Sequence, residues 1–249
     1  MFLRWLVTVF PREMSRAWQT MRPALAVWLV LSVALALLAS VTTRTVSTDL
    51  ALAQAAASLL ILVAIAWALD CSETGRALDM GELFSLYLRR TPALLGYGAL
   101  AFGLCTAAKA LTLIAVVMVL GGSDGGLVAA RGLSLVVYLT LLVRFCFFPF
   151  LVVLAERGDF ATLISEAGGV ARPAAQLAWP LFVSDRLAQG RRWRLLPYVM
   201  LISFAPGLVW SLSGQGTILA LAGAEMFAFM SYAVVFSYYR ERTSELAGQ

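Results

Sequence analysis

Residues 93–120 read ALLGYGALAFGLCTAAKALTLIAVVMVL, an apolar run interrupted by a single charge, Lys109. A helix of about 20 apolar residues is long enough to cross the hydrocarbon core of a bilayer. This run is longer than one crossing requires, so we expect it to tilt, to kink or to extend into the membrane interface. Gly96, Gly98 and Gly103 near its start would let another helix pack closely against it.

Five further apolar segments, all shorter, resemble this run in composition. Hydrophobic residues make up 61% of the 249-residue chain and charged residues 13%, whereas a soluble domain has about half and about a quarter. The sequence therefore predicts an all-α polytopic membrane bundle of six transmembrane helices, formed by residues 1–249 as a single integral domain. The predicted spans are Ala24–Val41, Ala51–Leu69, Ala93–Leu120, Gly132–Ala155, Leu196–Leu212 and Ile218–Tyr238.

The basic residues flank these spans unequally. Fifteen of the 19 lysines and arginines lie in the N-terminal segment, the loops 70–92 and 156–195, and the C-terminal tail. The opposite loops contain only Arg44 and Arg131. Positively charged loops stay on the cytoplasmic side of a membrane. The pattern predicts a multi-pass membrane protein with both termini in the cytoplasm.

Three segments outside the spans combine basic and apolar residues and are predicted to lie at the inner membrane interface. They are residues 1–22, 79–90 and 159–194. The first lacks a small-residue cleavage site, so we interpret it as an interfacial segment rather than a cleavable signal peptide. In the second, an acid at the start and bases at the end match the dipole of a helix. A frayed terminus and solvated linkers are the alternatives.

Three charged residues fall inside predicted spans and form a candidate intramembrane cluster: Lys109, Arg144 and Glu225. Counted from the outer face at 1.5 Å per residue, their depths are roughly 13–16, 18 and 10 Å. Because charges in hydrocarbon are costly, we expect Glu225 to bridge Lys109 or Arg144. An ion pair that fixes helix register is the ordinary interpretation, and a polar site for an anion is the functional one. Pro149 in the same span as Arg144 predicts a kink.

Composition and motifs argue against several functions. The chain has no histidine, no Gly-Lys-Ser/Thr phosphate-binding loop and no nucleophile–base arrangement, so we predict no enzyme. Cys71, Cys105 and Cys146 lack metal-site spacing, and no cofactor is predicted. The net charge of +5 does not indicate nucleic acid, because the arginines flank apolar spans.

One stretch has a recognisable layout. Residues 144–169 (RFCFFPFLVVLAERGDFATLISEAGG) place an arginine and a proline in an apolar span, followed by an acidic exit and an amphipathic helix. This layout resembles the membrane domain of some bacterial glycerophosphoryl diester phosphodiesterases and the YciC-like six-span inner-membrane proteins, over about residues 50–240. The later pattern of an arginine–serine helix, a glycine and a basic aromatic segment matches residues that follow further along than in those families: Ser184, Arg186, Leu187, Gly190, Trp193 and Arg194.

The resemblance implies a fold and a location, the bacterial inner membrane, but not an activity. Because the inner loops are basic and aromatic and no catalytic set is present, we expect a non-catalytic partner or organiser in the membrane that binds lipid or another membrane protein. The alternative is a transporter or ABC-type permease component that works with a separate ATPase, for which Asp79–Arg90 would be the coupling helix. An enzyme is the least favoured hypothesis. The predicted inner-face contact residues are Arg89, Arg90, Arg186, Arg191, Arg192, Trp193 and Arg194.

Overall fold

The computed structural model describes residues 7–44, 48–166, 171–213 and 218–247, and over these residues it contains helices and no strand. This confirms the predicted all-α class. The elements in chain order are α2 (Phe10–Met21), η1 (Arg22–Ala24), α3 (Leu25–Arg44), α4 (Thr48–Thr74), α5 (Met80–Leu120), α6 (Asp124–Arg144), α7 (Phe148–Leu154), η2 (Arg157–Phe160), α8 (Ala161–Ser165), α9 (Ala171–Leu177), α10 (Trp179–Ala188), α11 (Arg192–Ser213) and α12 (Ile218–Ala247).

Four stretches of the described chain are long and apolar enough to cross a membrane. They overlap the first, third, fourth and sixth predicted spans. The other two predicted spans, Ala51–Leu69 and Leu196–Leu212, lie within α4 and α11. The four stretches are Phe10–Leu37, Met80–Leu120, Asp124–Leu154 and Leu219–Leu246.

Helix α5 joins two segments that the sequence analysis separated. The predicted interfacial segment 79–90 and the span from Ala93 form one helix of 41 residues, which passes through Pro92. Proline removes one backbone hydrogen bond from a helix interior, but it does not end the helix here. Asp79 is the N-cap, and its side chain accepts a hydrogen bond from the Gly81 amide at 2.8 Å, which fixes where the helix begins.

The fourth predicted span, Gly132–Ala155, is broken into α6 and α7. The break occupies residues 145–147, and Pro149 lies in the first turn of α7. Proline is well tolerated there because the amides of a first turn have no helical partner. The predicted kink is therefore a break located just before the proline. The interfacial segment 159–194 is likewise divided, into η2, α8, α9 and α10.

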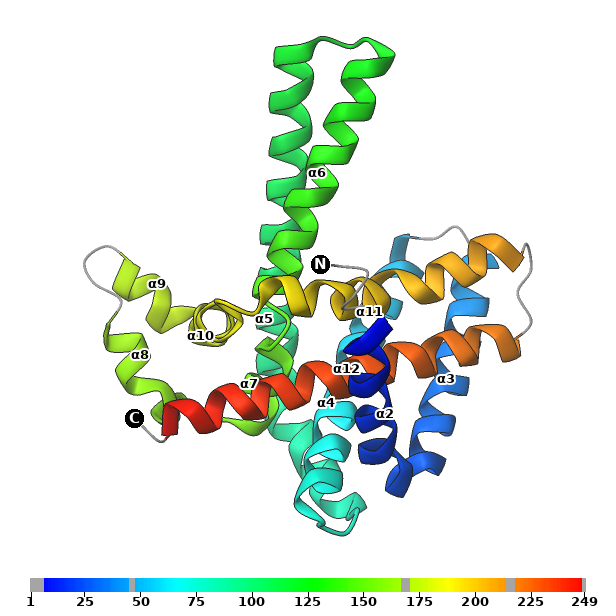
Figure 1. Ribbon diagram of the computed structural model, residues 1–249, viewed down its shortest axis with the longest axis vertical. Coiled ribbons are helices and arrows are strands. Elements are labelled where there is room, and N and C mark those ends of the chain that lie inside the picture. The colour runs from blue at the N-terminus through cyan, green and yellow to red at the C-terminus, as the bar shows by residue number, and fades with distance from the viewer. Residues whose placement is uncertain (1–6, 45–47, 167–170, 214–217, 248–249) are drawn as a thin grey trace.

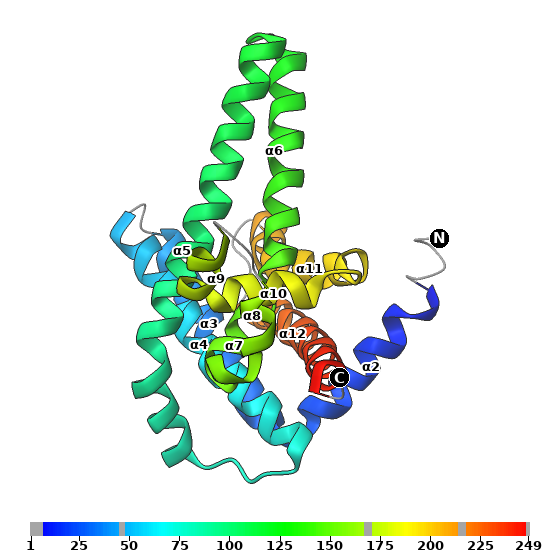
Figure 2. The same ribbon diagram turned by 90° about the vertical axis from the view of Figure 1, so that its left-hand side faces the viewer.

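Helices α5 and α6 form a hairpin whose upper part extends beyond all other described helices as an arm, as both views show (Figures 1 and 2). The α11–α12 hairpin runs across α3 in the body below the arm (Figure 1). The arm exposes large apolar side chains, among them Phe102 at 66%, Met118 at 80% and Val128 at 70%. Such a surface suits lipid better than water.

The core lies in the body, where α4 meets α7 and α12. Residues 62–71 of α4 are all buried, and a helix that is buried on every side must be central in its bundle. Aromatic rings from the other two helices pack beside it. Phe150 of α7 lies 5.1 Å from Phe236 and 5.7 Å from Tyr239 of α12, measured between ring centroids. These contacts hold the charged ends of the helices in fixed positions.

Candidate functional site

Most charged residues that the structure describes lie outside the arm, on elements here together called the basic side. It is formed by α2, the connection between α4 and α5, the short helices α8–α10, the start of α11 and the end of α12. Ion pairs and hydrogen bonds on this side join residues that lie far apart in the sequence. They determine which charges remain available to a ligand.

Asp70, near the end of α4, is the most enclosed acid of these ion pairs. Its side chain is 11% exposed and accepts hydrogen bonds from both Arg76 and Arg240. Arg240 also reaches Glu73 at 3.3 Å, and Arg76 reaches Glu82 on α5 at 2.9 Å. Asp70 therefore joins α4 to α12 and to the chain that leads into α5.

The turn after α4 brings Arg76 back to Asp70. Gly75 has φ +67°, a left-handed conformation that favours glycine. The Arg76 amide donates to the Cys71 carbonyl at 3.0 Å, which is the bonding pattern of a Schellman helix end. Burial raises the pKa of the Cys71 thiol, so the thiol stays protonated and unreactive.

Glu13 holds α2 against the α11–α12 hairpin. One carboxylate oxygen accepts from the Tyr238 hydroxyl at 2.5 Å, and the other accepts from the Tyr198 hydroxyl. Hydrogen bonds to an ionised group are the stronger class. On the other side of Tyr198, the ring of Phe10 stacks at 5.7 Å. Both the charge and the apolar face of α2 are thus used in packing.

Asp185 of α10 is the partner of two arginines. Its carboxylate lies 2.6 Å from Arg192 and 3.6 Å from Arg144. The neighbouring Ser184 is fully buried. Its hydroxyl donates to the Arg144 carbonyl at 2.8 Å and accepts from the Phe147 amide at 3.1 Å. Helix α10 therefore satisfies the backbone groups that the break between α6 and α7 leaves open.

At the end of α12, two further arginines pair with acids. Arg191 lies 2.6 Å from Glu241 and 3.5 Å from Glu245. Arg242 lies 2.5 Å from Glu245 and donates to the Leu187 carbonyl at 3.3 Å. These pairs tie the end of α12 to the turn between α10 and α11.

The predicted cluster of Lys109, Arg144 and Glu225 is not brought together. Lys109 lies on the arm, with its ammonium 5.5 Å from the centre of the Tyr138 ring. Arg144 pairs with Asp185, and no ion pair joins Glu225 to any residue that the structure describes. The expected bridge fails because α6 ends at Arg144, which directs this residue toward α10. The transporter hypothesis rested on these three charges in one polar site and on proline kinks, and it stays a prediction.

Of the seven predicted inner-face residues, the six arginines divide into two groups, and Trp193 stands apart. Arg191 and Arg192 are half-buried and paired with acids. Trp193 between them and Arg194 is 86% exposed. The remaining arginines form no ion pair with the described residues, and the Arg186 guanidinium lies 5.5 Å from the Phe182 ring. The unpaired arginines of the predicted set are Arg89, Arg90, Arg186 and Arg194.

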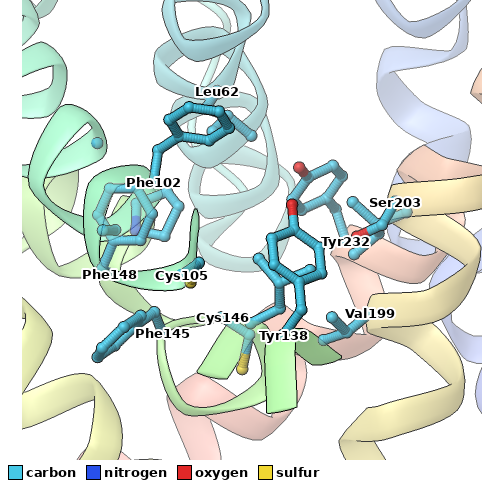
Figure 3. A pocket seen from close by; sticks show the side chains of 15 residues that line it. Leu62, Phe102, Cys105, Tyr138, Phe145, Cys146, Phe148, Val199, Ser203 and Tyr232 are labelled. Carbon is cyan, nitrogen blue, oxygen red and sulfur yellow. The ribbon is translucent and has the colours of Figure 1, made fainter. Parts of the chain in front are cut away.

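An apolar cavity of about 210 Å³ lies between the base of the arm and the α11–α12 hairpin. Figure 3 shows the rings of Tyr138 and Tyr232 along its wall, together with Cys105 and Cys146. All three cysteines of the chain are free thiols. The other labelled side chains of the wall are apolar except for Ser203. Such a lining suits a hydrocarbon chain and not a charged ligand.

A second, polar cavity of about 350 Å³ lies on the opposite face of the same hairpin, between α2, α11 and α12. Charged and hydroxyl side chains from all three helices line it. Its polar lining residues are Glu13, Arg16, Thr20, Arg191, Arg194, Ser237, Tyr238 and Glu241.

Sequence patterns did not indicate the contacts of the acids and of the serine that organise the basic side. Glu13 carried one signal, because it is the only acid in the basic segment 1–22. Ser184 belongs to the pattern that resembles the six-span families, but neither it nor Asp185 carried a signal of its contacts, since their partners lie about 40 residues earlier in the chain. Asp70 directly follows the second predicted span, but no sequence pattern indicated its pairing with Arg240.

No family model, curated protein or solved structure matches this chain. The resemblance to YciC-like proteins and to phosphodiesterase membrane domains therefore stays a prediction. Within the described residues, no three histidine, cysteine, aspartate or glutamate side chains gather as metal ligands would.

Proposed function

We propose that this chain is a non-catalytic protein of a bacterial inner membrane that binds lipid or another membrane protein through its basic side. In this proposal the chain crosses the bilayer six times, by α3, α4, α5, the α6–α7 unit, α11 and α12. Both termini lie in the cytoplasm. The protein acts as a partner or organiser embedded in the membrane.

Helix length and charge placement support the topology. Four stretches have the length and hydropathy of a crossing helix, and α4 and α11 are long helices that contain the other two predicted spans. The outer end of the arm, between Leu120 and Asp124, lies far from α8–α10 in Figure 1. The arginines cluster at the other end, as they do on the cytoplasmic side of membrane proteins.

The observation that carries the binding proposal is a surplus of arginine on the basic side. The acids there are largely engaged by partners in the chain itself, as Asp70, Glu13 and Asp185 illustrate. The remaining positive charge faces outward and can attract anionic headgroups. The arginines without an ion pair to the described residues are Arg12, Arg16, Arg22, Arg89, Arg90, Arg157, Arg172, Arg186 and Arg194.

The exposed Trp193 strengthens this interpretation. A tryptophan that is 86% exposed beside two arginines matches the composition of membrane-interface anchors, where the ring sits among headgroups. On a surface that faces only water, exposing the same apolar ring would be unfavourable. We infer that lipid, or a partner embedded in the same leaflet, covers it.

Purification of the full chain tests the binding proposal. The protein is extracted from bacterial membranes in a mild detergent, and retained lipids and crosslinked proteins are identified by mass spectrometry. We expect a retained anionic lipid or one specific protein partner, and a weaker yield of it from Trp193→Ala. Recovery of neither from the wild-type protein would refute the proposal.

Reporter fusions test the topology separately. A reporter active only in the cytoplasm and one active only in the periplasm are fused in turn to each end of the chain. We expect cytoplasmic signals from both ends. A periplasmic signal from either end would exclude an even number of crossings with the proposed orientation.

A further inference from the structure

We propose that the polar cavity between α2, α11 and α12 binds a phosphate group, either that of an anionic lipid headgroup or that of a small soluble phosphate. The inference deepens the proposed function, on which it rests, by naming the site and the chemistry of the ligand. The cavity measures about 350 Å³, at the lower end of the range of about 300–1,000 Å³ typical of small-molecule sites.

The charges that line the cavity are not equally available. Glu13 accepts hydrogen bonds from two tyrosine hydroxyls, one on each of its oxygens. Arg191 and Glu241 pair with each other at 2.6 Å. These groups therefore have partners without any ligand.

Arg16 and Arg194 are the available charges. Both line the cavity and are exposed, and neither has an ion pair to any residue that the structure describes. They come from different helices, α2 and α11, so they approach the same space from two sides. Two guanidinium groups that line one cavity can contact the same anion, and the planar guanidinium suits phosphate because it donates two parallel hydrogen bonds.

Hydroxyl groups complete a phosphate-type lining. Thr20 and Ser237 also border the cavity. Each hydroxyl donates to a carbonyl of its own helix, at 3.2 Å for Thr20 and 2.8 Å for Ser237. The hydroxyl donors can turn from those carbonyls to a bound phosphate oxygen, because the carbonyls retain their helical amide partners.

The position of the cavity matches the headgroup layer. One wall is α2, which buries Met14, Ala17 and Met21 and leaves Trp18 41% exposed. A helix with an apolar inner face and an exposed tryptophan beside arginines is suited to the membrane surface. In the proposed orientation the cavity therefore lies beside the inner leaflet, within reach of a lipid phosphate.

Charge-matched variants test the site in the full chain. We compare a cavity variant, Arg194→Gln, with a control variant, Arg131→Gln, which removes the same charge from an exposed arginine of α6 outside both the cavity lining and the basic side. Each protein is reconstituted in phosphatidylcholine nanodiscs with increasing phosphatidylglycerol, and retained phosphatidylglycerol is measured by native mass spectrometry. A second arm titrates detergent-solubilised protein with inorganic phosphate, and unfolding temperatures verify that each variant is folded.

We expect the cavity variant to lose affinity by about tenfold or more for phosphatidylglycerol, for inorganic phosphate, or for both. The control variant should stay within about twofold of wild type. Loss for the lipid alone identifies a headgroup site, and loss for inorganic phosphate alone identifies a soluble phosphate. Equal losses of affinity in the cavity and control variants would overturn the proposed site. A folded cavity variant with unchanged affinity would do the same. Either result leaves the proposed function standing. If wild type binds no anionic lipid, no phosphate and no partner, the proposed function itself fails.

Discussion

The Ser184 hydroxyl of α10 donates a hydrogen bond to the carbonyl of Arg144, the last residue of α6, at 2.8 Å. The same oxygen accepts from the Phe147 amide. One side chain therefore bonds backbone groups on both sides of the break between α6 and α7. The contact joins residues 40 positions apart. It explains how an interruption at the end of a long apolar segment is tolerated without exposing backbone groups to an apolar core.

Replacing this hydroxyl should destabilise the protein. Ser184→Ala leaves a buried carbonyl and a buried amide unpaired, so we expect a loss of about 1–3 kcal/mol in the free energy of unfolding. Ser231→Ala is the matched control, because Ser231 is equally buried but donates to the Phe227 carbonyl within its own helix at 2.9 Å. Denaturant unfolding in micelles measures both. Equal losses would show that the bridge to α6 contributes nothing of its own.

Asp70 and Glu73 both contact Arg240 but should differ in how much they contribute to the free energy of unfolding. Asp70→Asn weakens the hydrogen bonds to two arginines at an enclosed carboxylate, and we expect a loss of about 1.5–3 kcal/mol. Glu73→Gln removes a longer and more exposed contact, at 3.3 Å with a side chain that is 34% exposed, so we expect less than about 1 kcal/mol. Unfolding curves of the two variants test this order, and a reversed order would contradict the role given to Asp70.

The pH dependence of the same pair has a definite sign. Burial raises the pKa of the Glu73 carboxyl, and the charge of Arg240 opposes that rise without cancelling it. The folded protein therefore holds this proton more tightly than the unfolded chain. The contribution of this proton to the free energy of unfolding is full below the ordinary pKa of a glutamate, about 4.3. It is lost as the pH rises through the raised pKa of Glu73.

Unfolding of wild type and Glu73→Gln across mildly acidic pH measures this contribution. We expect the stability of wild type, relative to the variant, to fall as the pH rises through that window. A relative stability that rises with pH would mean that Arg240 outweighs burial.

Tyr238 should anchor α2. Tyr238→Phe deletes a 2.5 Å hydrogen bond to the Glu13 carboxylate, so we expect about 1.5–3 kcal/mol of destabilisation and faster hydrogen exchange in α2. The neighbouring Tyr239 is also buried and makes no hydrogen bond through its hydroxyl to the described residues. Tyr239→Phe should leave exchange in α2 unchanged. Faster exchange in both variants would point to loose packing of α12 instead.

Lys109 should make membrane insertion of its helix less favourable. It is exposed on the arm and contacts the Tyr138 ring at 5.5 Å. We expect Lys109→Leu to improve membrane insertion of the Ala93–Leu120 segment, by up to about 2.5–3.5 kcal/mol. A glycosylation-based insertion assay measures this. A drop in insertion, or loss of retained lipid in the full chain, would restore a functional role for the lysine.

Hydropathy predicts the helices of this protein well because burial in lipid requires long apolar runs. It does not predict how the helices meet. The pairing of Asp70 with Arg240 joins residues 170 positions apart, and Asp185 takes the place expected for Glu225. Loop charges indicated which side is basic, yet they could not separate Arg191, which is paired with acids, from Arg194, which faces a cavity. That distinction depends on tertiary contacts.

The unbroken length of α5 has a mechanical consequence. At 1.5 Å per residue its 41 residues extend about 60 Å, roughly twice the thickness of the hydrocarbon layer. Such a rod must emerge into water at one or both faces of the bilayer, and it connects the Asp79 cap directly to the distant tip of the arm. A displacement of the N-terminus of α5, for instance by a protein bound there, would be transmitted along this helix to the tip of the arm.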